Sequence, residues 1–337
     1  MIKLSDIAAE LSVSTATISN ALTGKGRMKE DTRQHIREVA LSMGYEISAA
    51  SRGQKGQIIV IAEAAEVTFT AETICGISMA ARKSGTSCAV YDMCILKAGP
   101  GRDATVDQLQ PLIEHCITHH PVTPSCIIYI AQYPRHLPDL LTKMKVPCVE
   151  VCCYGTGAQA TVSYDDQQGA YLAVSHLIAN GHKCIAMLSG PVDSHSVSDR
   201  MIGYQRALID YGLTYHPKLV WIGDWETKSG RDLTRDLLMS SNRPDAIFAQ
   251  NDTMACGAIQ AAQEMGLHVP DDVAVVGFDN TMFTGWIIPS LTSVNPPFHE
   301  IGQKAFALAQ QLVAGQPLQE RQIKVPCNLV IRSSSTR

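Results

Sequence analysis

From residue 57 onward the chain alternates short apolar segments with longer amphipathic ones, and this pattern predicts βαβ units and parallel sheets. Eight strands are predicted, in two sets of four. The first set begins near Gln57–Ala62, Ser87–Tyr91, Ser125–Ile130 and Pro147–Val151, and the second near Cys184–Leu188, Lys218–Ile222, Asp245–Ala249 and Asp272–Gly277. Predicted helices between them include Ala71–Ser84, Gln167–Asn180 and Thr253–Met265. Because one sheet of eight strands would need a single very large core, the two sets predict two similar lobes.

The first 45 residues lack this alternation and predict three short helices instead. The stretch Asp6–Leu11 is helical in pattern, and Ser14 is a good N-cap for a second helix over Thr15–Leu22. A third helix is predicted over Asp31–Met43 and ends at Gly44. Short helices with a tight turn between the first two form a helix-turn-helix unit. Residues 46–56 are polar and small, and they predict a linker.

The charge of the chain is unevenly distributed. The whole chain has 28 Lys and Arg against 32 Asp and Glu, a net charge of −4, which argues against a uniformly basic nucleic-acid binder. The excess is basic in residues 1–55 and acidic in the remainder. A slightly basic head on an acidic body is typical of a small DNA-contacting module on a ligand-binding body.

The location of the protein is predicted from apolar runs and cysteines. No apolar run approaches the ~18 residues of a membrane span, and the N-terminal segment has no signal-peptide core. The 11 cysteines are odd in number, and many lie in strand-like runs where a thiol behaves as a small hydrophobe. We therefore expect a reduced, cytoplasmic protein that does not bind membranes.

The predicted strands also indicate where a ligand would bind. In open parallel sheets ligands lie beyond the carboxyl ends of the strands. In the first lobe this rule selects Phe69, Asp92 and Gln132; in the second it selects Ser189–Arg200, Asp224-Trp225, Gln250-Asn251-Asp252 and Asp279-Asn280. Carboxylates, amides, an arginine and aromatic rings together suit a polyhydroxylated ligand.

Several motifs in this chain resemble those of one known family. The segments Leu4-Ser5-Asp6-Ile7-Ala8, Val13–Asn20 and Gly44-Tyr45 resemble the DNA-binding head of the lactose/galactose repressor (LacI/GalR) family. Further matches follow in family order along the body: His176–His182, Leu188–Pro191, Arg200–Tyr204, Asn251–Ala255, Val269–Val273 and Gly277–Asp279. The chain is therefore similar to that family over nearly its whole length.

The resemblance implies an all-α helix-turn-helix head, residues 1–45, and a hinge, residues 46–56. It also implies an α/β body of two Rossmann-like lobes, periplasmic-binding-protein-like (type I), over residues 57–337, which binds the effector and forms the dimer. Lobe 1 is expected at about 57–159 and 292–324, and lobe 2 at about 160–290 and 325–337. The three crossovers are expected near 159–162, 287–294 and 322–327. We see no leucine heptad tail and so expect a homodimer rather than a tetramer.

A recognition helix presents its N-terminal side chains to base edges in the major groove. The expected base-facing residues are Thr15, Ala16 and Asn20, and the expected phosphate contacts are Ser5, Ser14, Thr17, Ser19, Lys25 and Thr32. Family members usually carry Arg where this chain has Asn20, and Asn pairs with adenine whereas Arg favours guanine. In the hinge, Arg52 is expected on phosphate. Gly53 and Gln54, which stands where the family has a minor-groove leucine, predict a weaker hinge helix with little wedge insertion.

For the cleft, the resemblance implies that Arg200 and Asp279 contact ligand hydroxyls and that Trp225 stacks on a ring. Asn251 is expected to bind a hydroxyl, while Asp252 is expected to cap the following helix. Phe69, Ser194 and Ser196 complete the expected effector contacts. The expected effector is a sugar, a sugar acid or a nucleoside. Its expected action is that of an inducer or of a corepressor.

Metal and catalytic sites find little support. His115 and His119 lie four residues apart on a predicted helix, which favours a solvated face over a zinc site, and Cys152-Cys153 is not a CxxC motif. The sequence has no GxxxxGK[ST] or GxSxG motif. We expect no cofactor, no metal and no catalysis. Two alternatives stay open: a sugar-binding protein without a DNA role, and an α/β enzyme that uses the same cleft.

Overall fold

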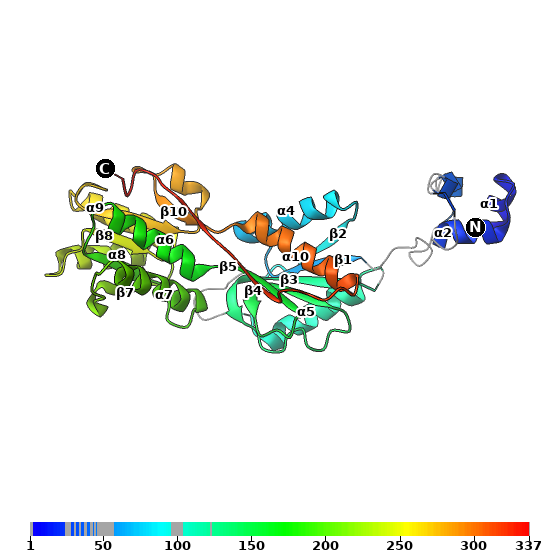
Figure 1. Cartoon of the computed structure of the whole chain (residues 1–337), viewed down its shortest axis with the longest axis horizontal. Coiled ribbons are helices and arrows are strands. Elements are labelled where there is room, and N and C mark those ends of the chain that lie inside the picture. The colour runs from blue at the N-terminus through cyan, green and yellow to red at the C-terminus, as the bar shows by residue number, and fades with distance from the viewer. Residues whose placement is uncertain are drawn as a thin grey trace.

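A computed structural model of the chain describes residues 3–23, 28–29, 32–33, 35–36, 39–40, 43, 45, 57–95, 104–121 and 123–336. Figure 1 shows a small helical head at the N-terminal end and a body of two lobes that lie side by side. None of the helices in the described ranges is long and apolar enough to cross a membrane.

The head contains α1 (Leu4–Glu10) and α2 (Thr15–Thr23). Ile7, Ile18 and Ile36 are buried together and hold these helices to the third helical segment. The hydroxyl of Ser14 accepts a hydrogen bond from the backbone N–H of Thr17 at 3.0 Å, so the N-cap predicted at Ser14 is confirmed.

The first lobe is a six-stranded parallel sheet covered by helices on both faces. Its strands lie in the order β11-β5-β4-β3-β1-β2. They are β1 (Ile58–Ala62), β2 (Cys88–Asp92), β3 (Cys126–His136), β4 (Cys148–Tyr154), β5 (Ala160–Tyr164) and β11 (Gln322–Val325). Helices α4 (Thr68–Lys83) and α10 (Phe298–Val313) pack together on one face, and α5 (Val106–Thr118) covers the other. Gly302 lets α10 approach the backbone of α4 at Thr73, where a Cβ would lie only 2.1 Å from the carbonyl oxygen.

The second lobe repeats this plan. Its strands lie in the order β12-β10-β9-β8-β6-β7, and β12 runs antiparallel to β10. They are β6 (Ile185–Ser189), β7 (Val220–Ile222), β8 (Ala246–Ala249), β9 (Ala274–Phe278), β10 (Thr292–Asn295) and β12 (Asn328–Val330). Helices α6 (Asp166–Ala179) and α7 (His195–Asp210) cover one face, and α8 (Thr227–Met239) and α9 (Asp252–Glu264) cover the other. Two short 3₁₀ turns, Pro217–Leu219 and Met282–Gly285, complete it.

The predicted fold class is confirmed, although each sheet has six strands rather than four. The four strands that were not predicted are β5 and β11 at one side of the first sheet and β10 and β12 at the same side of the second. Residues 160–164 alternate buried and half-buried side chains, and residues 292–295 read Thr-Ser-Val-Asn, so neither is an apolar run. The apolar-run criterion finds strands with several consecutive apolar residues and overlooks these.

The lobe boundaries differ from those expected at two of the three crossovers. The strand β5 pairs with β4 and β11 in the first sheet, so the chain crosses after Tyr164 rather than near 159–162. The strand β10 pairs with β9 in the second sheet, so the chain returns after Asn295 rather than at 287–294. The third crossing, between Val325 and Asn328, lies within the expected range. Each of the first two crossings therefore follows a strand that still pairs in the sheet the chain is leaving, and β11 and β12 complete the two sheets on the last pass.

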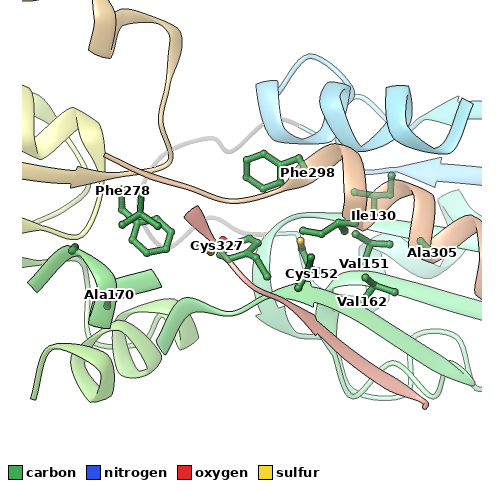
Figure 2. Packing of buried hydrophobic residues seen from close by; sticks show 14 of the residues in the cluster. Ile130, Val151, Cys152, Val162, Ala170, Phe278, Phe298, Ala305 and Cys327 are labelled. Atoms are coloured by element: carbon green, nitrogen blue, oxygen red, sulfur yellow. The ribbon is translucent and has the colours of Figure 1, made fainter. Parts of the chain in front are cut away.

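Buried side chains continue from one lobe to the other through the crossing segments. Phe278 ends β9 in the second lobe, Phe298 begins α10 in the first, and Cys327 lies on the third crossover. Figure 2 shows these residues between the lobes, with Cys152 of β4 close by. This shared apolar cluster packs the two lobes against each other at the base of the cleft between them.

Candidate functional site

A cleft of about 1400 Å³ lies between the two lobes. The structure brings together at this cleft all seven residues expected to contact the effector. They are Phe69, Ser194, Ser196, Arg200, Trp225, Asn251 and Asp279. Further lining residues come from the first lobe, so a ligand here would contact both lobes at once.

Arg200 lies on α7 at the floor of the cleft and is almost fully buried. Its Nε donates to Asp166 at 2.7 Å, and its Nη1 donates to the carbonyl oxygen of Gln250. The guanidinium carbon lies 3.6 Å from the centre of the Phe278 ring, a cation–π contact. Burial is the largest single effect and lowers the pKa of Arg200, but Asp166, Tyr164 and Asp279 together raise it by more, so the group stays charged. The Nη2 lies 3.7 Å from Asp279, too far for a strong bond, and keeps donor capacity toward the cleft.

Asp279 follows β9 directly and is held in a left-handed backbone conformation, with φ of 107°. Enclosure by the cleft walls raises the pKa of its carboxyl to about 8, although nearby Arg200 opposes this shift. A carboxyl group poised in this way can accept a hydrogen bond from a ligand hydroxyl, or donate one when protonated.

The cap of α9 is Asn251 rather than Asp252, so the capping role expected for Asp252 is wrong. The Oδ1 of Asn251 accepts from the backbone N–H of Met254, so Asn251 caps α9, and its Nδ2 donates to the carbonyl of Trp225 at 2.9 Å. Asp252 is fully buried and accepts from the backbone N–H and hydroxyl of Thr281 and from the hydroxyl of Ser293. Asn251 thus holds the loop of Trp225, and Asp252 ties α9 to the segment after Asp279.

The indole of Trp225 faces the cleft floor at 6.0 Å from the guanidinium of Arg200. It lies against Gly190, where a Cβ would be only 2.1 Å from the ring. Trp225 itself has a φ of 73°, and Asn280 beside Asp279 has 48°. Non-glycine residues in this region are strained, and such strain concentrates at binding sites.

The three remaining expected contacts occupy different depths. The buried Ser196 has its hydroxyl 3.4 Å from Asp166, so it supports the carboxylate that holds Arg200. Ser194 is the N-cap residue of α7 at the wall of the cleft. Phe69, in the first turn of α4, packs its ring 5.6 Å from that of Phe298.

The first lobe adds a second arginine that the sequence did not indicate. After a bulge between Ile130 and Arg135, β3 pairs with β4 again, and this stretch brings Tyr133, Arg135 and His136 to the cleft. The Nη2 of Arg135 lies 2.6 Å from Glu63, which is fully buried and also accepts from the hydroxyl of Tyr129 at 2.5 Å. The Nε of Arg135 is buried and has no hydrogen-bond partner among the described residues. No local pattern links residues 72 positions apart.

Two contacts join the lobes, the first between residues that line the cleft and the second outside its lining. The ring of Tyr154, at the end of β4, lies 4.5 Å from that of His195 on α7. The Nζ of Lys324 on β11 lies 3.3 Å from Asp199 on α7. Relative movement of the lobes would change both contacts.

In the head, Thr15, Ala16 and Asn20 are exposed on α2, and Ser5 and Thr32 are exposed as well. The hydroxyls of Ser14 and Thr17 lie 2.8 Å apart and cap the helix, and Ser19 is half-buried. Lys25 and Arg52, with the rest of the hinge, lie outside the described residues. Three of the recognition-helix candidates therefore share an accessible helix surface.

In the part of the chain that the structure describes, no group of three or more His, Cys, Asp or Glu is placed to hold a metal ion. The rings of His115 and His119 lie 3.9 Å apart, and His119 Nδ1 contacts the carbonyl of His115 instead.

Two family models match this chain. Residues 3–48 match the family described as "Bacterial regulatory proteins, lacI family", and residues 174–335 match "Periplasmic binding protein-like domain". Among curated relatives, catabolite control protein A of Priestia megaterium is 29% identical over 337 residues, covering 98% of each chain. The HTH-type transcriptional repressor PurR of Proteus mirabilis is 28% identical over 341 residues, covering 99% of this chain and 97% of its own.

Solved structures agree on the fold. The Lac repressor dimer bound to operator and the anti-inducer ONPF matches with a TM-score of 0.76, at 24% identity, over 100% of this chain and 99% of its own. The complex of the transcriptional regulator CelR with cellobiose matches with a TM-score of 0.67, at 25% identity, over 99% and 100%. With a matching head, a matching body and full-length relatives, the chain belongs to the LacI/GalR family of bacterial transcriptional regulators.

Proposed function

We propose that this protein is a transcriptional repressor that binds a near-palindromic operator in double-stranded DNA as a homodimer. A small metabolite in the inter-lobe cleft sets its affinity for that DNA. The observation that carries the proposal is the union, in one chain, of a head that matches the lacI family model with a body whose cleft gathers the seven expected effector contacts.

The mechanism is a two-state equilibrium between arrangements of the lobes. The metabolite changes DNA affinity only by its differential affinity for the two arrangements. Because its contacts would come from both lobes, it favours one inter-lobe angle, and the hinge transmits that angle to the heads. Two heads are needed because one small head makes too few contacts for selective binding.

The effector class follows from the floor of the cleft. Arg200 and Asp279 would bind hydroxyls and Trp225 would stack on a ring, which suits a sugar or a nucleoside. The cellobiose named for CelR, a structural relative, fits this class. The carboxylates, amides and guanidinium groups of the cleft suit hydrogen bonding, so we propose no catalysis, and we propose a cytoplasmic location.

A mobility-shift assay with the promoter region of the protein's own gene tests this function. The wild-type protein should shift that fragment, and sugars or nucleosides should change the affinity. Asn20→Ala, on the exposed surface of α2, should alter the ranking of operator variants. Glu10→Gln, exposed on α1 and outside the predicted contacts, serves as the control. Absence of any shift would favour a sugar-binding protein without a DNA role, and metabolite turnover that Arg200→Ala abolishes would favour an enzyme.

A further inference from the structure

The charges on the cleft walls restrict which metabolites the cleft can bind. This inference rests on the proposed function, because it concerns the effector of the same cleft. It depends on two observations, namely how the two arginines are neutralised and which groups surround them.

Neither arginine is available as a free positive charge. Arg200 is paired with Asp166 at 2.7 Å, and that carboxylate is itself almost fully buried. Arg135 is paired with Glu63 at 2.6 Å, and Glu63 is fully buried. A paired guanidinium can still donate hydrogen bonds through its remaining N–H groups, but the charge that would attract an anion is already compensated.

The remaining charged groups of the wall are acidic. Described lining residues contribute five further carboxyl groups and no lysine. They are Glu72, Asp193, Asp224, Glu226 and Asp279. Even when Asp279 is protonated, as its pKa of about 8 favours at neutral pH, four of these carboxylates remain beside the two paired arginines. An excess of one sign of charge in a cleft concentrates the field inside it.

We propose that the effector is an uncharged ring compound, such as a neutral sugar or a nucleoside, and that the cleft rejects phosphate esters and sugar acids. A phosphate or carboxylate group placed in the cleft would face carboxylates. Among the described residues that line the cleft, each arginine is already paired with a carboxylate, and there is no lysine to bind the anion. Hydroxyl groups, in contrast, can accept from Arg200 Nη2 and donate to Asp279 without a change of net charge.

Matched pairs of ligands test this proposal on the full-length protein. Hexoses, disaccharides and purine nucleosides are each compared with their own phosphate ester or uronic acid by titration calorimetry, and inorganic phosphate is the probe for bare anion binding. In any pair that binds, the neutral member should bind at least about tenfold more tightly. Inorganic phosphate should give no heat of binding.

A charge-neutralised variant identifies the cause. Asp193→Asn with Glu226→Gln removes two exposed wall carboxylates and should narrow the gap between neutral and anionic members. The same charge change at the exposed Asp236 and Glu320, outside the cleft lining, should leave the gap unchanged. Equal or tighter binding of an anionic member, or no binding by any neutral one, overturns the inference. Promoter binding measured in parallel shows whether the proposed regulator survives that result.

Discussion

The two lobes meet the cleft with the same pair of groups, a guanidinium beside a buried carboxylate, but they hold that pair differently. In the second lobe Arg200 lies on a helix, stacks on Phe278 and bonds to Asp166. In the first lobe Arg135 lies beyond a bulge in β3, and Glu63 receives Tyr129 as a second donor. Arg200 is thus held by a ring and a buried carboxylate of its own lobe, whereas Arg135 lies beyond the bulge of β3 and bonds to Ala104 and Glu63.

This difference implies that the two lobes have different roles in ligand binding. The contacts to Asp166, Gln250 and Phe278 hold the Arg200 side chain in one position. The second lobe therefore provides a preorganised anchor for a ligand. Arg135, beyond the bulge of β3, moves with the first lobe when the lobes move relative to each other. The lobe arrangement therefore decides whether the first-lobe groups reach a ligand already held by the second.

The largest effect is expected from removing the anchor. Arg200→Ala leaves the buried Asp166 without its ion-pair partner, which destabilises folded proteins by about 3–5 kcal/mol. Urea unfolding should show this loss, and the melting temperature should no longer respond to the effector. Arg206→Ala, an exposed residue of the same helix, is the control and should cost less than about 0.5 kcal/mol. A loss below about 1 kcal/mol for Arg200→Ala would contradict an enclosed anchor.

The next effect is a pH dependence that originates in the second lobe. Burial raises the pKa of Asp252 from 3.8 to about 6, so the folded state prefers the protonated form. The contribution of this group is fully present below pH ~4 and is lost as the pH rises to about 6, by up to about 3 kcal/mol. Unfolding free energies at pH 4 to 7 should show this slope, and Asp252→Asn should reduce it. Part of the slope should remain, because the carboxyl of Asp279, whose pKa is raised to about 8, contributes over the same pH range. An unchanged slope in the variant would assign the dependence to other groups.

The counterpart in the first lobe should be milder. Arg135→Ala removes one donor from Glu63, which keeps the hydroxyl of Tyr129 and the backbone N–H of Gln132. Loss of one charge-assisted hydrogen bond costs about 2 kcal/mol. Urea unfolding of Arg135→Ala and Arg200→Ala under the same conditions measures the ratio of their losses in stability. If Arg135→Ala proved the costlier of the two, the ranking of the lobes would be reversed.

The same contrast explains how much of the site could be predicted from the sequence. In the second lobe the groups follow strands directly, as Asp279 follows β9, so a local rule finds them. Arg135 belongs to a strand that continues past a bulge, and its partner Glu63 is distant in sequence, so only the folded chain unites them. The capping of α9 by Asn251 rather than Asp252 is similar, because Asp252 is drawn away by hydrogen bonds from Thr281 and Ser293, which are distant in sequence. The family motifs predicted the fold and the cleft floor, whereas long-range pairing determined the rest.

The smallest effect tests the preorganised anchor without touching a polar group. In Gly190→Ala the new Cβ would lie 2.1 Å from the indole of Trp225, so the ring must leave its position. Effector affinity should fall about tenfold, which corresponds to about 1.4 kcal/mol, since the ring would have to be repositioned on binding. Gly285→Ala, where no atom lies within 4 Å of the added Cβ, is the matched control and should bind as the wild type does. Titration of both variants with the same ligand decides the point. Equal affinity would mean that Trp225 is not part of the anchor, and that the floor of Arg200 and Asp279 holds the ligand by itself.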